Sequence, residues 1–316
     1  MSSKKNWNQQ PEKGNMFFLN VSRWLTKYTP VWILKLVTLV VITYYYLTSS
    51  CARGNIQQYL QRLQATFPEI NLGYAAKFRV FYNFAQTIVD KLAITQNRKI
   101  YNKIILQDPD NLLEKMHQKQ PGQIFVFSHH GCAPICQIFF QDKIYQDIKL
   151  NIILDKNNSL KFNRTLEKSR QNSNNINLLQ IGALDVQQML ELEQRLARGE
   201  WLAIAVDRFD PSKDKYTAVD FLGEKANLPL GPWLLSSLLT APINTLACYR
   251  EGNDFVLELK SFSSPLIAKG KQRKEQIAQV MQQYAHFLAL SCKQRPLFWF
   301  NFYDFWSIGK DNQNDL

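Results

Sequence analysis

The sequence predicts an α/β fold with a mostly parallel central sheet flanked by helices. After about residue 93, short apolar runs alternate with helical stretches, which is the pattern of parallel strands joined by helical crossovers. The composition supports a globular chain, because 46% of the 316 residues are hydrophobic and 20% are charged. Such a chain can bury a substantial core, and its composition excludes disorder, collagen and coiled coil.

The individual elements follow from hydrophobic periodicity. Residues 53–93 are expected to be helical, because apolar side chains recur there at steps of three and four. Buried strands are expected at 123–127, 150–154, 177–180, 201–206 and 243–248. Helices are expected between them, near 133–141, 158–171, 185–199 and 231–240. Phe255–Leu259 is expected to pair antiparallel at an edge of the sheet, and a last amphipathic helix is expected at 271–291.

The first fifty residues differ from the rest. Met16–Lys27 has the pattern of an amphipathic helix, and Val31–Leu47 is an apolar run with one charged residue, Lys35, that ends in three tyrosines. Three interpretations stay open for this run: a transmembrane helix, a buried helix, or an anchor lying in the membrane interface. Residues 1–50 are therefore expected to be a basic N-terminus with a membrane-anchoring helix, and residues 51–316 an α/β domain.

Charge and cysteine content narrow the partners and the compartment. The chain has 38 Lys and Arg against 26 Asp and Glu, a net charge of +12 that suits an anionic partner. No nucleic-acid-binding signature accompanies it, so a membrane surface with anionic lipid or an acidic carrier is expected instead of nucleic acid. The five cysteines are scattered without a CxxC pair, which favours a reducing compartment and buried thiols, with no metal site expected.

The strongest candidate for chemistry follows the strand at 123–127. Ser128, His129, His130 and Gly131 stand between this strand and a helix, where open α/β sheets place their ligands. A histidine there is a candidate general base. Gly131 would let a substrate approach the backbone, and the amides at the start of the helix could stabilise an oxyanion. The alternative is that both histidines only fill a crowded turn.

A second pair of residues ends another buried strand. Asp207 and Arg208 follow the strand at 201–206 and are expected at the same edge of the sheet. Arg208 could bind a thioester oxygen or a phosphate, or pair with Asp207 in a structural salt bridge. Further along, Phe221-Leu222-Gly223 and Pro229-Leu230-Gly231-Pro232 are expected to form tight turns.

These residues resemble a known family. The chain is similar to acyltransferases of the lysophospholipid acyltransferase superfamily, in the branch related to the lipid A late acyltransferases of lauroyl and myristoyl type. The resemblance covers nearly the whole chain, and the last of its motifs is the most specific. The motifs are Trp7 with Glu12 and Gly14, Arg53 with Tyr59-Leu60, Ser128-His129-x-Gly131, Asp207-Arg208, the two turns that contain Gly223 and Gly231, and the aromatic run from Trp299 to Trp306.

The resemblance implies a glycerol-phosphate acyltransferase-like fold and a reaction. A fatty acyl group would pass from a thioester, on acyl carrier protein or coenzyme A as co-substrate, to a hydroxyl or amine of a lipid or glycolipid. No cofactor is expected. His129 would be the base, Ser128, His130, Gly131, Arg208 and Gly231 would bind substrate, and the protein would work at the cytoplasmic face of a bacterial inner membrane.

One position departs from the family pattern. The family places an acidic residue five positions after its histidine, where it orients the ring, and this chain has Pro134 there. Three explanations stay open. Another carboxylate orients His129, with Asp207 the first candidate and Asp220 and Glu224 weaker ones; or His129 works unaided; or the chain is a catalytically inactive homologue that binds lipid or acyl carrier protein.

Overall fold

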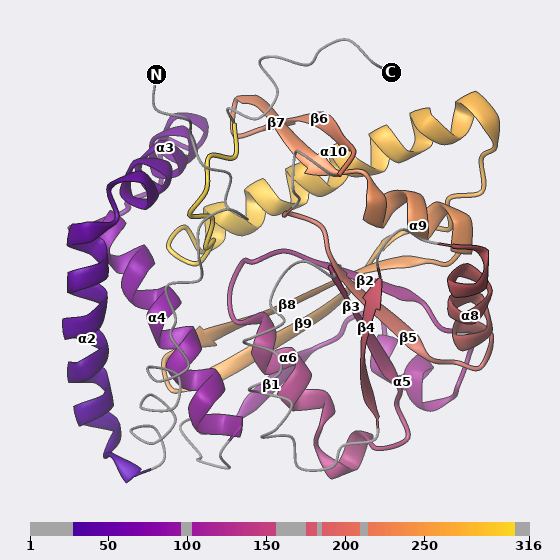
Figure 1. Cartoon of the computed structure of the whole chain (residues 1–316), viewed down its shortest axis with the longest axis horizontal. Coiled ribbons are helices and arrows are strands. Elements are labelled where there is room, and N and C mark those ends of the chain that lie inside the picture. Colours follow the sequence, from indigo (N-terminus) through magenta and orange to yellow (C-terminus); the bar gives the residue numbers. More distant parts are fainter. Residues whose placement is uncertain (1–27, 96–102, 156–174, 182–184, 209–213, 307–316) are drawn as a thin grey trace. The chain divides into compact units, whose positions relative to one another are not determined.

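The computed structural model describes residues 28–95, 103–155, 175–181, 185–208 and 214–306 (Figure 1). The chain forms two compact units. The sheet unit consists of Tyr101–Arg208 and Leu228–Met281, and the helical unit of Met1–Ile100, Phe209–Asn227 and Gln282–Leu316. The expected division into an anchor over 1–50 and an α/β domain over 51–316 stays a prediction.

The sheet unit is built on a seven-stranded, mostly parallel sheet of order β1-β9-β8-β2-β5-β3-β4. Its strands are β1 (Ile104–Gln107), β2 (Ile124–Phe127), β3 (Leu150–Asp155), β4 (Ile176–Ile181), β5 (Trp201–Ala205), β8 (Ile243–Glu251) and β9 (Asp254–Ser263). The predicted α/β class is confirmed, and a strand lies at each of the five predicted places. One of them, β4, is an edge strand whose residues 177–179 are only half-buried, so the prediction that it is buried is wrong. The central strands β2 and β5 are almost fully buried, which explains their continuous apolar sequences.

The position of β9 corrects one prediction. The strand is antiparallel to β8, as expected, but it does not lie at the edge of the sheet. The edge strand on this side of the sheet is β1, which pairs with β9 in parallel from Ile104 opposite Phe255 to Gln107 opposite Glu258. A four-residue strand that is only half-buried leaves too weak a pattern in the sequence, so its pairing with β9 was not predicted.

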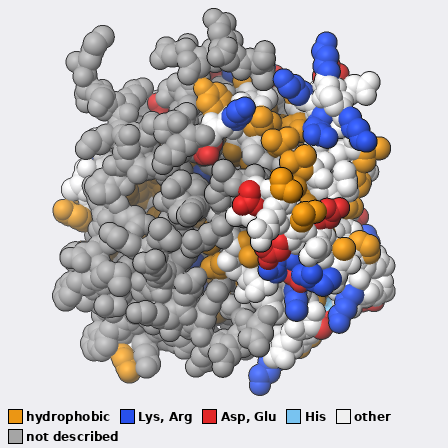
Figure 2. All heavy atoms as spheres, turned by 45° about the vertical axis from the view of Figure 1, so that its right-hand side comes forward, with side chains coloured by type: hydrophobic (Ala, Val, Ile, Leu, Met, Phe, Trp, Pro, Cys, Tyr) orange, Lys and Arg blue, Asp and Glu red, His pale blue; other side chains and the backbone are white. Residues whose placement is uncertain are grey.

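Helices connect these strands. α6 (Ala133–Phe140) packs against β8, α5 (Leu112–His117) against β9, and α8 (Val186–Ala197) against β5 and α9 (Gly231–Leu239). The Asp185 side chain caps α8 by accepting a 2.7 Å hydrogen bond from the Gln188 amide. Figure 2 looks onto the side of α8 and α9, where exposed hydrophobic side chains lie among Lys, Arg and acidic groups.

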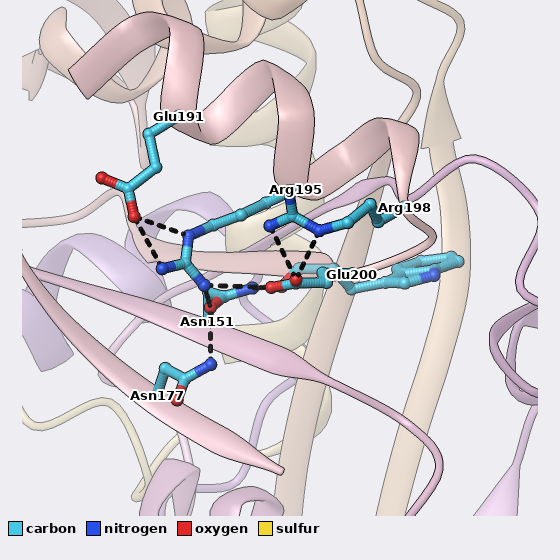
Figure 3. Close-up of polar contacts among 7 residues, drawn as sticks. Asn151, Asn177, Glu191, Arg195, Arg198 and Glu200 are labelled. Atoms are coloured by element: carbon cyan, nitrogen blue, oxygen red, sulfur yellow. Dashed lines mark hydrogen bonds and ion pairs between the residues drawn. The ribbon is translucent and has the colours of Figure 1, made fainter. Parts of the chain in front are cut away.

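A buried polar network joins the amino ends of three strands (Figure 3). The Asn151 side chain on β3 donates to Glu200, just before β5, and accepts from Asn177 on β4, each at 3.0 Å. Arg195 of α8 donates to both Asn151 and Glu200 at 3.0 Å, and Arg198 donates to the other oxygen of Glu200. The network therefore fixes β3, β4 and β5 at the edge opposite to their carboxyl ends.

The helical unit contains α2 (Val31–Thr48), α3 (Ser50–Thr66), α4 (Ala76–Thr95) and the hairpin of β6 (Tyr216–Phe221) with most of β7 (Glu224–Pro229). α10 (Gly270–Gln294) passes from the sheet unit into it. The aromatic run from Trp299 to Trp306 packs into the core of the helical unit. Trp299 is fully buried, and its ring lies 4.9 Å from that of Tyr59 and 5.3 Å from that of Phe221. The motif noted in the sequence is thus core of this unit.

The predicted apolar helix is present as α2, and its two sides differ. Leu34, Thr38 and Ile42 are buried on the side that contains its α4 contact, whereas seven large hydrophobic side chains are exposed: Trp32, Leu36, Leu39, Val40, Val41, Tyr44 and Leu47. Within the described part of the chain, no single helix is both long and apolar enough to cross a membrane. The pair Trp32–Thr48 and Ser50–Thr66, bent by 92°, passes that test jointly on length and composition alone.

Some predictions fall outside the described residues. They are the motif of Trp7, Glu12 and Gly14, the amphipathic helix at 16–27 and the helix at 158–171.

Candidate active site

His129 and Asp207 meet at the carboxyl edge of the sheet. β2 and β5 are neighbours in parallel register, with Phe127 opposite Ala205, so the residues two positions beyond each strand come side by side. The Nδ1 atom of His129 lies 2.8 Å from one carboxylate oxygen of Asp207, and the His129 backbone amide donates to the other oxygen, also at 2.8 Å. One carboxylate therefore holds both the ring and the main chain of His129.

The electrostatics of this pair favour a neutral imidazole beside an ionised carboxylate. Burial and the Arg208 charge lower the pKa of His129, and the opposing effect of Asp207 does not overcome them. Burial alone would raise the pKa of Asp207, but His129 and Arg208 lower it below its ordinary value. With Nδ1–H donating to an anionic oxygen, Nε2 is left without a proton and can accept one.

Accessibility separates the two partners. The His129 side chain is 34% exposed and that of Asp207 is 2% exposed, so only the ring is open to an incoming molecule. Arg208 follows Asp207 directly and is half-buried. Ser128 and His130, on either side of His129, are buried. The structure thus brings His129, Asp207 and Arg208 together at this edge of the sheet.

The two glycines named from the sequence lie in different surroundings. Gly131 is buried, its backbone is left-handed with φ of +83°, and it lies directly against the backbone of Cys248. Gly231 begins α9 at an exposed position, where a Cβ would meet open space. Crowding therefore requires glycine at Gly131 but not at Gly231.

The position where the family has its acidic residue lies in the first turn of α6. Proline is tolerated at this position because a backbone N–H in the first turn would have no carbonyl acceptor within the helix. The two weaker carboxylate candidates from the sequence have partners of their own in the helical unit. Asp220 pairs with Lys225 at 2.8 Å and Glu224 with Arg62 at 2.7 Å.

The sheet unit contains a second histidine–carboxylate pair with the same spacing. His117, at the end of α5, has its Nδ1 atom 2.8 Å from Asp147. Both of these side chains are partly exposed, at 31% and 42%. Because it reproduces the contact at the surface, this pair is a natural control for experiments on His129. Among the described residues, no group of three or more His, Cys, Asp and Glu side chains is arranged to hold a metal ion.

A neutral histidine oriented by a buried carboxylate, at the carboxyl edge of an α/β sheet, defines a site suited to general base chemistry. The family comparison agrees with this class. Residues 75–307 match the family model of the bacterial lipid A biosynthesis acyltransferases, and the chain belongs to that family. No individually curated protein matches the chain. The chain is thus an acyltransferase-family protein related to the lipid A late acyltransferases, as its motifs indicated.

Proposed function

We propose that this protein is an acyltransferase that moves a fatty acyl group from a thioester to a hydroxyl or amine of a lipid or glycolipid. The observation that carries the proposal is the 2.8 Å contact between the His129 ring and Asp207. It supplies, from the end of the neighbouring strand, the carboxylate that the family pattern places at the position of Pro134. The dyad is therefore composed of residues 78 positions apart in the chain.

Each residue has a distinct part in the proposed reaction. Nε2 of His129 takes the proton of the acceptor hydroxyl or amine as its oxygen or nitrogen attacks the thioester carbonyl carbon. Asp207 keeps the ring in the tautomer that can do so and stabilises the imidazolium that forms. When the tetrahedral intermediate collapses, the C–S bond breaks and the thiolate leaves, taking the proton from the imidazolium. The products are the acyl ester or amide and the thiol.

The neighbouring residues support the charges that develop. Arg208 is the cation closest in sequence to the dyad, and its charge already acts on the His129 ring. A guanidinium there would stabilise a thioester oxyanion or bind a phosphate of either substrate. The backbone amides around Ser128, His130 and Gly131 would complete the oxyanion site. The family resemblance implies that Gly231 is a further substrate contact. The reaction as proposed uses no cofactor.

The test is acyl transfer by the purified protein. Radiolabelled acyl groups on acyl carrier protein and on coenzyme A are supplied separately, with lipid and glycolipid acceptors, and the labelled product is separated by thin-layer chromatography. Wild type and His117→Ala should turn over alike, and His129→Ala should lose on the order of 10²–10⁴ of the rate, the range for a general base. Equal turnover by wild type and His129→Ala would refute the mechanism. Binding of a donor without any turnover by wild type would favour the inactive homologue.

We further propose that the protein works at the cytoplasmic face of a bacterial inner membrane, anchored through α2. The exposed side of α2 is apolar, with Trp32 68% and Tyr44 71% exposed, and the net charge of +12 would favour anionic lipid. Flotation with vesicles of anionic phospholipid tests this. Val40→Glu should weaken binding, while Tyr74→Glu, at a residue 95% exposed outside α2, should not. Equal flotation of both variants and wild type would contradict the assignment.

A further inference from the structure

We propose that the backbone contact between Gly131 and Cys248 of β8 is the positioning element that aims the His129 ring at Asp207. The inference rests on the proposed function, in which that ring is the base. It assigns to Gly131 a role other than substrate contact, and it adds Cys248, a residue that the sequence did not indicate. Cys248 is not taken to touch substrate, and the positioning role of Gly131 is separate from any part that its backbone amide has in the oxyanion site.

The register of the strands shows why such an element is needed. β2 lies between β8 and β5 in the sheet. Along β8 the last regular pair is Val126 with Thr245, and an isolated parallel bridge then joins Gly131 to Cys248. Gly131 is five residues after Val126, whereas Cys248 is only three residues after Thr245. The segment that follows β2 therefore contains two residues more than the segment of β8 that it faces.

The two extra residues shift the register of the chain relative to β8 but not relative to β5. Towards β5 the register continues without a shift, because the Val206 amide donates to the Phe127 carbonyl and the His129 amide to the Asp207 side chain. Residues 127–130 must then bulge away from β8 while staying beside β5. A bulge re-aims the side chains it contains, and here one of them is His129.

The bulge is closed by contacts that only glycine permits. A Cβ on Gly131 would lie 2.2 Å from the Cys248 carbonyl oxygen and 3.2 Å from its carbonyl carbon, both backbone atoms that cannot turn aside. The same carbonyl accepts a 2.5 Å hydrogen bond from the Cys132 amide. The turn that contains His129 is thus held from both sides, by the Asp207 carboxylate just after β5 and by the Cys248 carbonyl on β8.

The side chain of Cys248 adds packing to this contact. It is fully buried, and β8 packs there against α6, which carries the buried Cys136. Burial raises the pKa of the Cys248 thiol well above its usual range, so the group stays protonated and apolar. Its part is to fill the space behind the turn, while the carbonyl of the same residue sets the position of Gly131.

The test compares two glycine-to-alanine variants that differ in crowding. Gly131→Ala meets backbone, whereas Gly252→Ala, in the β8–β9 hairpin, has a similar left-handed φ of +59° and nothing within 4 Å. Gly131→Ala should lose on the order of 10² in kcat at unchanged KM, the cost of a displacement near 1 Å at a reacting group. Gly252→Ala should keep the wild-type kcat. Equal kcat in the two variants would overturn the proposal.

A second readout does not depend on turnover. The ring ¹⁵N shifts of His129 report which nitrogen is protonated, and wild type, Gly252→Ala and Cys248→Ala should all show a proton on Nδ1 and none on Nε2 at neutral pH. In Gly131→Ala this single tautomer should be lost. If Cys248→Ala loses it and Gly131→Ala keeps it, thiol packing and not the backbone contact positions the ring, and the proposal is wrong.

The proposal stays testable if Gly131→Ala does not fold. In wild type the Cys132 amide, hydrogen-bonded to Cys248, should exchange with deuterium as slowly as the amides of β2, and exchange at the rate of an unprotected amide would contradict the proposal. Failure of the proposed function is a different result. In that case wild type shows no acyl transfer, while the ¹⁵N shifts and the amide exchange still report whether Gly131 and Cys248 position the ring.

Discussion

Replacing Asp207 by asparagine is the most informative single change, because it keeps the shape of the side chain and removes its charge. The carboxylate has two acceptor oxygens, one used by the His129 ring and one by the His129 amide. An asparagine has one acceptor oxygen and one donor NH₂ group. If the oxygen takes the backbone amide, the NH₂ group donates to Nδ1, and the ring proton must move to Nε2.

The size of the effect follows from this geometry. With the proton on Nε2, the atom that faces the acceptor can no longer take a proton, so the base is lost although the ring stays in place. A tautomer change of this kind in a histidine–carboxylate dyad costs up to about 10⁴ in kcat, about 5 kcal/mol of transition-state stabilisation. The loss should not exceed that of His129→Ala, because Asp207 acts only through the ring. Since Asp207 binds no substrate in the mechanism, KM should change little.

The assay is steady-state acyl transfer, with Asp147→Asn as the matched control. That variant makes the same change in the His117–Asp147 pair, which has the same 2.8 Å spacing at the surface, and it should keep wild-type kinetics. The ¹⁵N shifts of the His129 ring should show the tautomer change directly. If Asp207→Asn keeps more than a tenth of the wild-type kcat, Asp207 does not orient the base and the reasoning is refuted.

Three other predictions concern pH dependence and stability. Arg208→Gln removes a charge that lowers the pKa of His129, so the acid limb of the kcat/KM profile should move to higher pH; an unmoved limb would contradict the assignment. Glu200→Ala breaks the ion pairs of this buried carboxylate with Arg195 and Arg198 and should lower the free energy of unfolding in urea by about 3 kcal/mol. Glu191→Ala removes a side chain that is 56% exposed and should cost under about 0.5 kcal/mol. Equal costs would show that the network does not stabilise the fold. Trp299→Ala should cost about 3–5 kcal/mol, as expected for a fully buried tryptophan, and a loss below about 1 kcal/mol would be inconsistent with its packing.

The strands that hold the site could be predicted from the sequence because they are buried on both faces. β2 and β5 are continuous apolar runs, and each is followed by polar residues at the sheet edge, which made His129 and Asp207 neighbours by topology. The hairpin of β6 and β7 was not predicted. The tight turn at Leu222 and Gly223, with φ of +51° and +81°, was recognised, but Glu224–Pro229 contains two charged residues and a proline and has no clear strand pattern.

The contact between His129 and Asp207 could be proposed but not fixed from the sequence. Any carboxylate at the same sheet edge was a candidate, and only the register of β2 with β5 selects one. The positioning role of Cys248 could not be predicted from the sequence. The two-residue excess opposite β8 depends on how strands 117 residues apart pair at Gly131, and no local pattern encodes a pairing over that distance.

The central claim is that His129 and Asp207 act as one unit, and a double-mutant cycle tests it most directly. The kcat/KM of acyl transfer is measured for wild type, His129→Ala, Asp207→Asn and the double variant. Since Asp207 acts only through the ring, removing it should cost nothing once His129 is gone, and the double variant should equal His129→Ala. Additive losses, with the double variant slower than His129→Ala by the full effect of Asp207→Asn, would contradict the account.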